Sequence, residues 1–213
     1  MRPAHSDAAV RVMLVDDHLL VRRGFRRMLE DDPAIRVVAE AGDGQEAIDT
    51  AEREHPDVVV MDFALPSMNG AVATRRILEK LPETAVLILS MHAETAYVRN
   101  CLEAGARGYL LKNAMDLELV EAVKNVAAGR TVIDPRVALP PDDKADTPKL
   151  SARELEVLQL IVHGKSNKDI AVMLSLSVNT VSVHRANIMN ALDIHNTAEL
   201  VVYAIRNGLV SIA

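Results

Sequence analysis

The residues of this chain that are best suited to chemistry are charged ones that directly follow apolar, strand-length runs. They are Asp16, Asp17, Asp62 and Lys112. The carboxyl ends of parallel strands meet at one edge of a sheet, so we expect three acids and one amine to converge there. Two carboxylates about 4 Å apart repel by about 4 kcal/mol at an effective dielectric near 20. The cluster therefore needs a cation, and a hard divalent ion such as Mg²⁺ would suit it.

This set of residues is suited to phosphoryl transfer. With Mg²⁺ and Lys112 screening its charge, Asp62 can attack phosphorus and form an acyl phosphate. Ser90 ends the apolar run 85–89 and carries a hydroxyl that can donate to a phosphoryl oxygen. Tyr109, three residues before Lys112, has a ring that can rotate to follow that hydroxyl.

Each of these residues has an ordinary interpretation when it is taken alone. An acid after a strand is usually a helix cap or a solvated loop residue, Lys112 a surface charge, Ser90 a turn residue and Tyr109 a core ring. Their combination favours a site. A haloacid dehalogenase type of enzyme would need a second aspartate two residues after Asp62, where this chain has Ala64. No substrate pocket can be identified, so we do not expect an enzyme acting on a free substrate.

Apolar periodicity gives the elements that position these residues. Strands are expected at 11–15, 36–40, 57–61, 85–90 and 107–111, and helices at 18–31, 45–55, 70–81, 94–105 and 116–128. Strict alternation predicts an α/β fold, a five-stranded parallel sheet with helices on both faces. This unit would span residues 1–130.

The composition changes after residue 130. Residues 131–147 are rich in Pro and Asp and predict a linker. Residues 148–213 predict an all-α domain of four helices that opens with a capping box at Ser151 and Glu154. Its later helices are expected at 167–174, 178–192 and 197–207, and the first two of these form a helix-turn-helix pattern.

Composition limits the class of protein. The chain has 213 residues, of which 49% are hydrophobic, and no apolar run approaches the about 20 residues needed to cross a bilayer. We expect a soluble protein of the cytoplasm with no membrane partner. The net charge of -6 divides into -5 for residues 1–130, -2 for 131–147 and +1 for 148–213. The single cysteine, Cys101, is interpreted as a packing residue.

Residues 11–130 resemble the receiver domain of bacterial two-component response regulators. The resemblance rests on Asp16-Asp17, on Asp62 with Pro66 and Gly70 after it, and on Ser90, Tyr109 and Lys112. It implies a flavodoxin-like fold and a cognate histidine kinase that donates a phosphoryl group to Asp62. Ser90 and Tyr109 would form the switch. Mg²⁺ would be held by Asp17, Asp62 and the main-chain carbonyl of Ala64, with Asp16 acting mainly through a water.

Two positions of the receiver bear on the lifetime of the acyl phosphate. In the family this lifetime varies with the residues at the positions of Ala64 and His92. The small Ala64 leaves room for an attacking water. His92 either shields the site or faces solvent, and the sequence favours neither.

The carboxyl-terminal residues resemble the LuxR-type DNA-binding domain, which makes the whole chain similar to the NarL/FixJ subfamily. The resemblance rests on residues 150–154, 164–171, 179–184 and 199–201. It implies contacts with double-stranded DNA from Lys165, Lys168, Asn179, Thr180, Ser182, Val183, Arg185 and Ala186. Relatives often carry lysines where this chain has Ser182 and Ala186, so its recognition helix has an uncharged face.

The main hypothesis is a transcription regulator that is switched by phosphorylation of Asp62. Phosphorylation would favour a homodimer on paired half-sites, or release the recognition helix from the receiver. The uncharged helix face leaves a second hypothesis open, a phospho-dependent protein-interaction module with weak or lost DNA binding.

Overall fold

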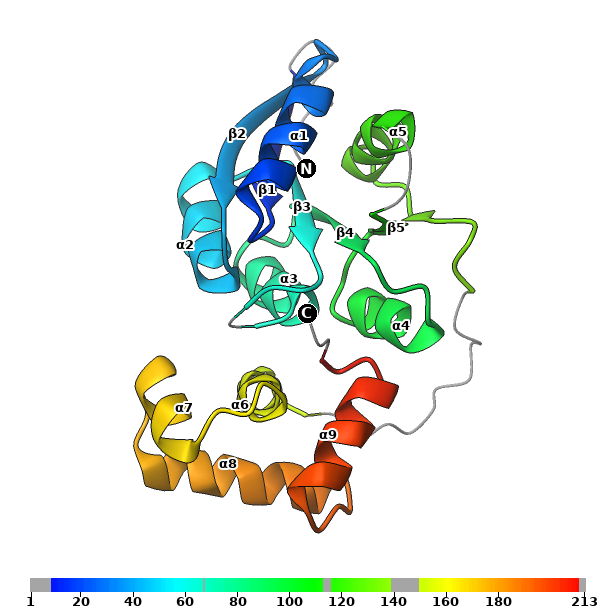
Figure 1. Ribbon diagram of the computed structural model, residues 1–213. Coiled ribbons are helices and arrows are strands. Elements are labelled where there is room, and N and C mark those ends of the chain that lie inside the picture. The colour runs from blue at the N-terminus through cyan, green and yellow to red at the C-terminus, as the bar shows by residue number, and fades with distance from the viewer. Residues whose placement is uncertain (1–8, 67, 113–115, 139–149, 211–213) are drawn as a thin grey trace.

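The computed structural model describes residues 9–66, 68–112, 116–138 and 150–210, and its first part is a parallel α/β sheet (Figure 1). The strand order is β2-β1-β3-β4-β5-β6, and every pairing is parallel. The strands are β1 Val10–Val15, β2 Ile35–Ala41, β3 Val58–Asp62, β4 Ala85–Ser90, β5 Gly108–Leu111 and β6 Val132–Ile133. The predicted ends of the first five differ from these by at most one residue.

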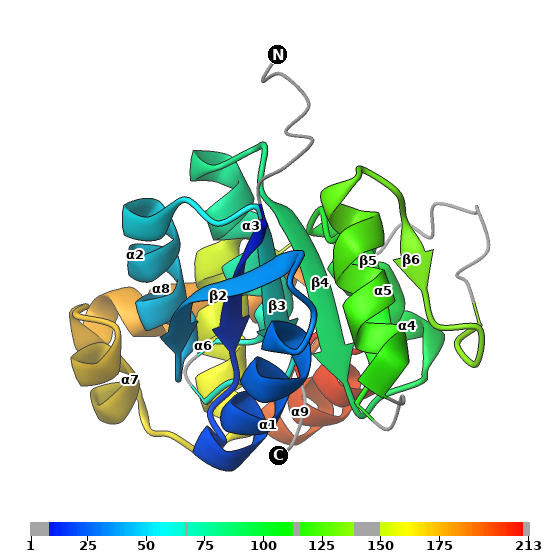
Figure 2. The ribbon, with the colours of Figure 1, turned by 90° about the horizontal axis from the view of Figure 1, so that it is seen from above.

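Helices cover both faces of the sheet (Figure 2). They are α1 Leu19–Glu30, α2 Gly44–Glu54, α3 Gly70–Lys80, α4 Thr95–Glu103 and α5 Asp116–Ala127. Val59 and Met61 of β3 pack with residues of α2, α3 and α4, whereas Val58 and Val60 pack with residues of α1 and α5. Because both faces of β3 are buried, its sequence is a continuous apolar run rather than an alternating one.

The sixth strand is a correction to the five-stranded prediction, and it lies inside the predicted linker 131–147. Val132 and Ile133 of β6 pair with Gly108 and Tyr109 of β5. The next residue, Asp134, is buried and accepts a hydrogen bond from the backbone N–H of Leu111 at 3.1 Å. A strand of two residues is too short to give a periodic signal, so the pattern did not reveal it. Residues 139–147 of the predicted linker lie outside the described residues.

The second part of the chain is the predicted all-α domain. Its helices are α6 Ala152–Val162, α7 Asn167–Met173, α8 Val178–Ala191 and α9 Thr197–Arg206. Ser151 and Glu154 form the predicted capping box at the start of α6, and Ser177 caps α8. The apolar sides of the helices meet in one core that includes Val157, Ile170 and Leu200. Both the α/β and the all-α predictions are confirmed.

The two domains are in contact through α3, α4, α6 and the end of α9. Arg76 of α3 forms an ion pair with Glu156 of α6. Asn100 of α4 donates a side-chain hydrogen bond to the carbonyl of Asn207 at 2.9 Å. Gly208 has φ 62°, and a Cβ there would lie 2.7 Å from the backbone N of Tyr97, so the close approach requires glycine. Helix α8 lies on the side of its domain away from the receiver sheet (Figure 1).

Among the described residues, none of the helices is both long and apolar enough to cross a membrane.

Candidate functional site

The acidic pocket is formed where β1, β3 and β5 end. Asp62 is the last residue of β3, and Asp16 and Lys112 directly follow β1 and β5. The Nζ atom of Lys112 lies 2.7 Å from Asp16 Oδ2 and 2.7 Å from Asp62 Oδ2. The two carboxylate side chains are only 4% and 3% exposed. Residues far apart in the sequence are thus brought into direct contact at the carboxyl edge of the sheet.

Burial and charge perturb both partners of this contact. Burial raises the pKa of Asp62 above its usual range, the Asp16 carboxylate adds to that rise, and Lys112 opposes it. Burial acts to lower the pKa of Lys112, but the two carboxylates outweigh it, so the pKa of Lys112 is raised. The amine therefore stays charged, and it offsets part of the cost of burying the Asp62 carboxylate.

Asp17 occupies the rim of the pocket. Its side chain is 31% exposed and lies 2.6 Å from Nδ1 of His18. The backbone N–H of His18 donates to Asp16 Oδ1 at 2.8 Å. Ligand atoms of Asp16, Asp17 and His18 lie within 4.8 Å of one another. His18 is not among the predicted site residues, although its position directly after Asp16 and Asp17 indicates that it lies at the same strand end.

The donor set of the pocket fits a hard cation. Asp16 and Asp62 share the amine of Lys112, Asp17 lies beside His18, and carboxylate oxygens are the ligands that Mg²⁺ prefers. The backbone N–H of Ala64 donates to Asp62 Oδ1 at 3.1 Å, so the chain after β3 folds back beside the carboxylate. Hence Lys112 and Ala64 each engage one oxygen of Asp62.

The two residues predicted to switch are both linked to the main chain of His92. Ser90 is buried, and its Oγ accepts from the backbone N–H of His92 at 3.1 Å. Tyr109 is buried as well, and its hydroxyl donates to the carbonyl of His92 at 2.7 Å. A movement of either hydroxyl would therefore change the hydrogen bonds that hold the main chain at His92, between β4 and α4.

The His92 side chain belongs to an aromatic cluster. Its ring stacks on Tyr97 with a centroid distance of 4.1 Å and an interplanar angle of 8°. Phe63 meets both rings edge to face. The imidazole lies against Tyr97 with 27% of the His92 side chain exposed, and a role in shielding the acyl phosphate stays a prediction.

The predicted DNA-contacting residues of α8 form an exposed face. Asn179, Ser182, Val183 and Ala186 are all exposed, with Val183 at 51%. Thr180 is only half-exposed, and its hydroxyl lies 2.7 Å from that of the capping residue Ser177. Four of the five predicted α8 positions other than Arg185 are therefore exposed, and the Ser182 hydroxyl also accepts a hydrogen bond from Asn167 Nδ2 at 3.1 Å.

The three predicted phosphate-gripping cations differ in their surroundings. Lys165 and Lys168 are exposed near the start of α7. Arg185 is half-buried, and it donates to Asn167 Oδ1 at 3.1 Å and to Thr197 Oγ1 at 3.0 Å. These bonds orient its guanidinium group within the domain, which the sequence did not reveal.

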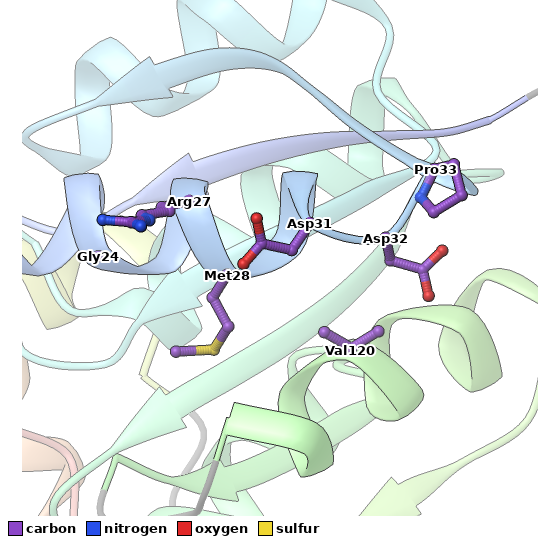
Figure 3. Close-up of a pocket in the computed structure, with 7 residues that line it drawn as sticks. All are labelled: Gly24, Arg27, Met28, Asp31, Asp32, Pro33 and Val120. Atoms are coloured by element: carbon purple, nitrogen blue, oxygen red, sulfur yellow. The ribbon is translucent and has the colours of Figure 1, made fainter.

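A separate hollow of about 510 Å³ lies between α1 and α5 (Figure 3). It is lined by Gly24, Arg27, Met28, Asp31, Asp32, Pro33 and Val120. Residues 31–33 lead into β2, so the hollow is near the amino end of a strand, where ligands of parallel sheets are not usually found. It contains none of the predicted site residues.

Comparison with known proteins agrees with the two-domain arrangement. The family model "Response regulator receiver domain" matches residues 12–124, and "Bacterial regulatory proteins, luxR family" matches residues 148–204. The chain is 40% identical to the oxygen regulatory protein NreC of Staphylococcus haemolyticus, over 94% of this chain and 99% of that protein.

Two solved structures extend the comparison. The response regulator ChrA of a heme-sensing two-component system is 37% identical, with a TM-score of 0.54 over 96% of this chain and all of that chain. The response regulator RcsB in complex with DNA is 25% identical, with a TM-score of 0.56 over 92% of this chain and 98% of that chain. The matched families are those of transcription regulators and not of enzymes, as expected. This chain therefore belongs to the two-component response regulators of the NarL/FixJ subfamily, which join a receiver to a LuxR-type DNA-binding domain.

Proposed function

We propose that this regulator accepts a phosphoryl group on Asp62 from a cognate histidine kinase. The observation that carries the proposal is the contact of Lys112 with both Asp16 and Asp62, each at 2.7 Å. In the transfer, a carboxylate oxygen of Asp62 forms a bond to phosphorus while the bond from phosphorus to the donor's imidazole nitrogen breaks. Lys112 would balance the charge on the phosphoryl oxygens.

Mg²⁺ is the cofactor that this donor set suits. Asp17, Asp62 and the main-chain carbonyl of Ala64 would hold it, with Asp16 acting through a water. When bound, the ion neutralises charge that develops on the phosphoryl group. Asp17 contributes a carboxylate from the rim, where its partial exposure leaves it accessible to a hydrated ion.

Ser90 and Tyr109 are proposed to read the phosphoryl group. The Ser90 hydroxyl currently accepts from the His92 backbone, and it can turn to donate to a phosphoryl oxygen. If the Ser90 hydroxyl turned in this way, the backbone N–H of His92 would lose its hydrogen-bond acceptor. The carbonyl of the same residue is held by the Tyr109 hydroxyl. The signal would then spread from the pocket to α4 through the backbone of His92.

The output is proposed to be binding to double-stranded DNA by a phosphorylated homodimer. Asn179, Ser182, Val183 and Ala186 would meet base edges, and Thr180 would support the start of α8. Lys165, Lys168 and Arg185 would contact phosphates. RcsB, to which this chain is similar, has been solved on DNA and as dimers on DNA. A regulator that binds chromosomal DNA works in the bacterial cytoplasm.

The exposure of α8 helps to choose between two ways in which phosphorylation would act, release of the recognition helix from the receiver and pairing of two copies. The receiver packs on α6 and on the end of α9, and the outer face of α8 is exposed. Unmasking of that face is therefore a less suitable mechanism than pairing of two copies, which places two α8 helices about one DNA turn apart.

A phospho-dependent protein-interaction module is the second candidate. The uncharged outer face of α8, with Val183 51% exposed, favours it because such a face also suits a protein partner. Footprinting on the protein's own upstream region separates the two candidates. Protection that increases on phosphorylation supports DNA binding, and its absence at every protein concentration supports the interaction module.

The phosphorylation step is tested by mass spectrometry of the intact chain after treatment with a small acyl phosphate and Mg²⁺. The wild type and the variant Asp49→Asn, which changes an exposed aspartate of α2, should gain one phosphoryl group. Asp62→Asn should gain none. An unchanged mass of the wild type would contradict the proposal.

A further inference from the structure

Arg22, in the first turn of α1, contacts the main chain between the two adjacent acids of the pocket. Its Nη1 atom donates to the main-chain carbonyl of Asp16. That carbonyl belongs to the peptide group that joins Asp16 to Asp17, so one guanidinium nitrogen holds the unit that carries both carboxylates. The Arg22 side chain is only 14% exposed, which limits competition from water for this bond.

The remaining polar groups of Asp16 are held by other elements. Its backbone N–H donates to the carbonyl of Ala41, at the end of β2, at 3.2 Å. Its side chain accepts from the backbone N–H of His18 and from Nζ of Lys112. Arg22 completes this set by holding the carbonyl. The orientation of the peptide group that leads into Asp17 therefore depends on Arg22.

Glu40 of β2 fixes the Arg22 side chain in turn. The Nε atom of Arg22 lies 3.3 Å from Glu40 Oε2, and the Glu40 side chain is 23% exposed. Burial acts to raise the pKa of Glu40, but hydrogen bonds from Arg26 and Arg22 outweigh it, so the pKa of Glu40 is lowered. The ionised carboxylate thus holds the guanidinium group and neutralises its charge. Without that neutralisation, a cation so near the acidic pocket would repel a metal ion.

The stability of α1 does not account for an arginine at this position. The positive end of the helix dipole disfavours a cation in the first turn of a helix. The first turn of α1 contains no acidic residue that would compensate Arg22 locally. The partners of Arg22 come from outside the helix, from β2 and from the end of β1. The contact with Asp16 gives the arginine a role that helix formation does not.

Arg26, one turn later in α1, provides a natural comparison. Its Nη1 atom lies 2.8 Å from Glu40 Oε1, so it shares the carboxylate that Arg22 uses. Its other hydrogen bonds go to Glu30 and to the carbonyl of Val37, and its side chain is 44% exposed. Arg26 thus joins α1 to β2, as Arg22 does, but through contacts that lie away from the acidic pair. The two arginines separate the packing of α1 from the support of the pocket.

We propose that Arg22 is a positioning residue for the magnesium site, because it holds the peptide between Asp16 and Asp17 and so sets the orientation of both carboxylates before the ion arrives. Mg²⁺ demands a near-ideal octahedral arrangement of oxygens, and ligands that must first be ordered bind more weakly. Groups that orient metal ligands typically contribute about 10- to 100-fold to metal affinity. This inference rests on the proposed function and adds a residue to its metal site.

The experiment is isothermal titration of the full chain with Mg²⁺ alone, for the wild type and Arg22→Gln. The dissociation constant of the variant should be higher by about tenfold, which corresponds to about 1.4 kcal/mol. The sign of the change is informative. Removal of a cation near the site would by itself strengthen the binding of Mg²⁺. Weaker binding therefore reports lost positioning, and unchanged or stronger binding would overturn the inference.

Two further variants test the same point. Arg26→Gln removes the other cation that pairs with Glu40, and its Mg²⁺ affinity should stay within about twofold of the wild type. Arg22→Lys keeps the charge, but one ammonium group lacks the fork that engages a carboxylate and a carbonyl together. It should also bind Mg²⁺ more weakly, by at least about threefold. Wild-type affinity in both Arg22 variants would contradict the proposal.

Urea unfolding of the three variants separates positioning from packing. Arg22→Gln and Arg26→Gln both lose a contact between α1 and β2, so both should lower the free energy of unfolding. Only the Arg22 variants should lose Mg²⁺ affinity. An equal loss of affinity in Arg26→Gln would overturn the inference, because the packing of α1 on β2 would then explain it.

Phosphorylation by a small acyl phosphate gives an independent measurement. In Arg22→Gln the Mg²⁺ concentration that gives half the maximal rate should rise by about tenfold, while the rate at saturating Mg²⁺ stays within about threefold of the wild type. A lower maximal rate with an unchanged half-saturating concentration would count against Arg22 as a metal-site residue. A wild type that binds Mg²⁺ but gains no phosphoryl group contradicts the proposed function alone, and the titrations still decide the role of Arg22.

Discussion

Arg76 of the receiver and Glu156 of the DNA-binding domain form an ion pair across the domain interface. The Glu156 side chain is 1% exposed, and Arg153 of its own helix donates to it at 2.7 Å. A carboxylate this buried requires compensation from its neighbours, because an unpaired charge in that position is strongly unfavourable. The receiver therefore supplies, through Arg76, part of the positive charge that stabilises the buried Glu156 carboxylate of α6.

We expect Arg76→Gln to lower the free energy of unfolding by about 1–3 kcal/mol, because Glu156 then keeps only Arg153 as a charged partner. Urea unfolding of Arg76→Gln, Glu156→Gln and the double variant gives the coupling energy of the pair. A coupling of at least about 1 kcal/mol is expected. A value within about 0.3 kcal/mol of zero would show that the ion pair does not join the domains.

Lys112→Met should destabilise the chain at pH 7.5 by about 1–3 kcal/mol, since two buried carboxylates lose their shared cation. Burial already raises the pKa of Asp62, and removal of Lys112 raises it further. Ionised Asp62 is then disfavoured in the folded state, so the loss is largest above its folded pKa and shrinks as the pH falls through that pKa. Urea unfolding between pH 5 and pH 8 measures this.

The control for that series is Lys80→Met, which changes a lysine that is 52% exposed. It should cost less than about 0.5 kcal/mol at every pH. A deficit of Lys112→Met that stays constant with pH would contradict the electrostatic explanation and point to lost packing.

Asp134→Asn should show a deficit that also shrinks as the pH falls, but in a lower pH window than that of Lys112→Met. The hydrogen bond from Arg136 lowers the pKa of Asp134 to about 2. Because the folded pKa is depressed, the ionised carboxylate stabilises the fold above its unfolded pKa near 4, and this contribution is lost as the pH falls from about 4 to about 2. The wild type should exceed the variant by about 1–2 kcal/mol at pH 5–7, with allowance for the partly exposed Arg136.

Urea unfolding at pH 7, 5, 4 and 3 checks this expectation. The matched control is Asp49→Asn in α2, an exposed aspartate. A difference between wild type and Asp134→Asn that grows below pH 4 would show that the assigned sign is wrong.

Two substitutions should separate affinity from specificity in DNA binding. Lys168→Ala removes an exposed cation and should weaken binding equally for all sequences, with the slope of log affinity against log salt reduced by about 1. Val183→Ala removes exposed methyl groups from α8 and should relax the preference at one base pair by about 1 kcal/mol.

Fluorescence anisotropy on a set of single-base operator variants measures both effects, with Lys80→Ala in the receiver as the control. An unchanged ranking of operators for Val183→Ala would remove this side chain from the base-reading set. An unchanged salt slope for Lys168→Ala would do the same for the phosphate contact.

The acidic pocket was predictable from the sequence because a general rule of parallel sheets determines it. Asp62 and Lys112 each end an apolar run, and strand ends converge whatever the length of the chain between them. The helices were predictable for a similar reason, since each has its own periodicity and, as at Ser151 and Ser177, its own cap.

The contacts that couple the domains had no such local signal. Gln159 and its partner Leu65 are 94 residues apart, and a glutamine inside a helix normally indicates a solvated position. Arg185 was interpreted as a phosphate contact, whereas its bonds to Asn167 and Thr197 depend on how α7, α8 and α9 pack. Strand β6 was not predicted because two residues are too few to show an apolar period.

The outward position of α8 has a consequence for the living cell. Since the receiver leaves the outer face of α8 uncovered, the proposed DNA binding would allow each copy of the protein to occupy a half-site weakly before any stimulus arrives. Gene expression under its control would then depend on protein abundance as well as on the kinase. Overproduction alone would mimic the stimulus, and tight control of the regulator's own synthesis would be needed to keep the response silent at rest.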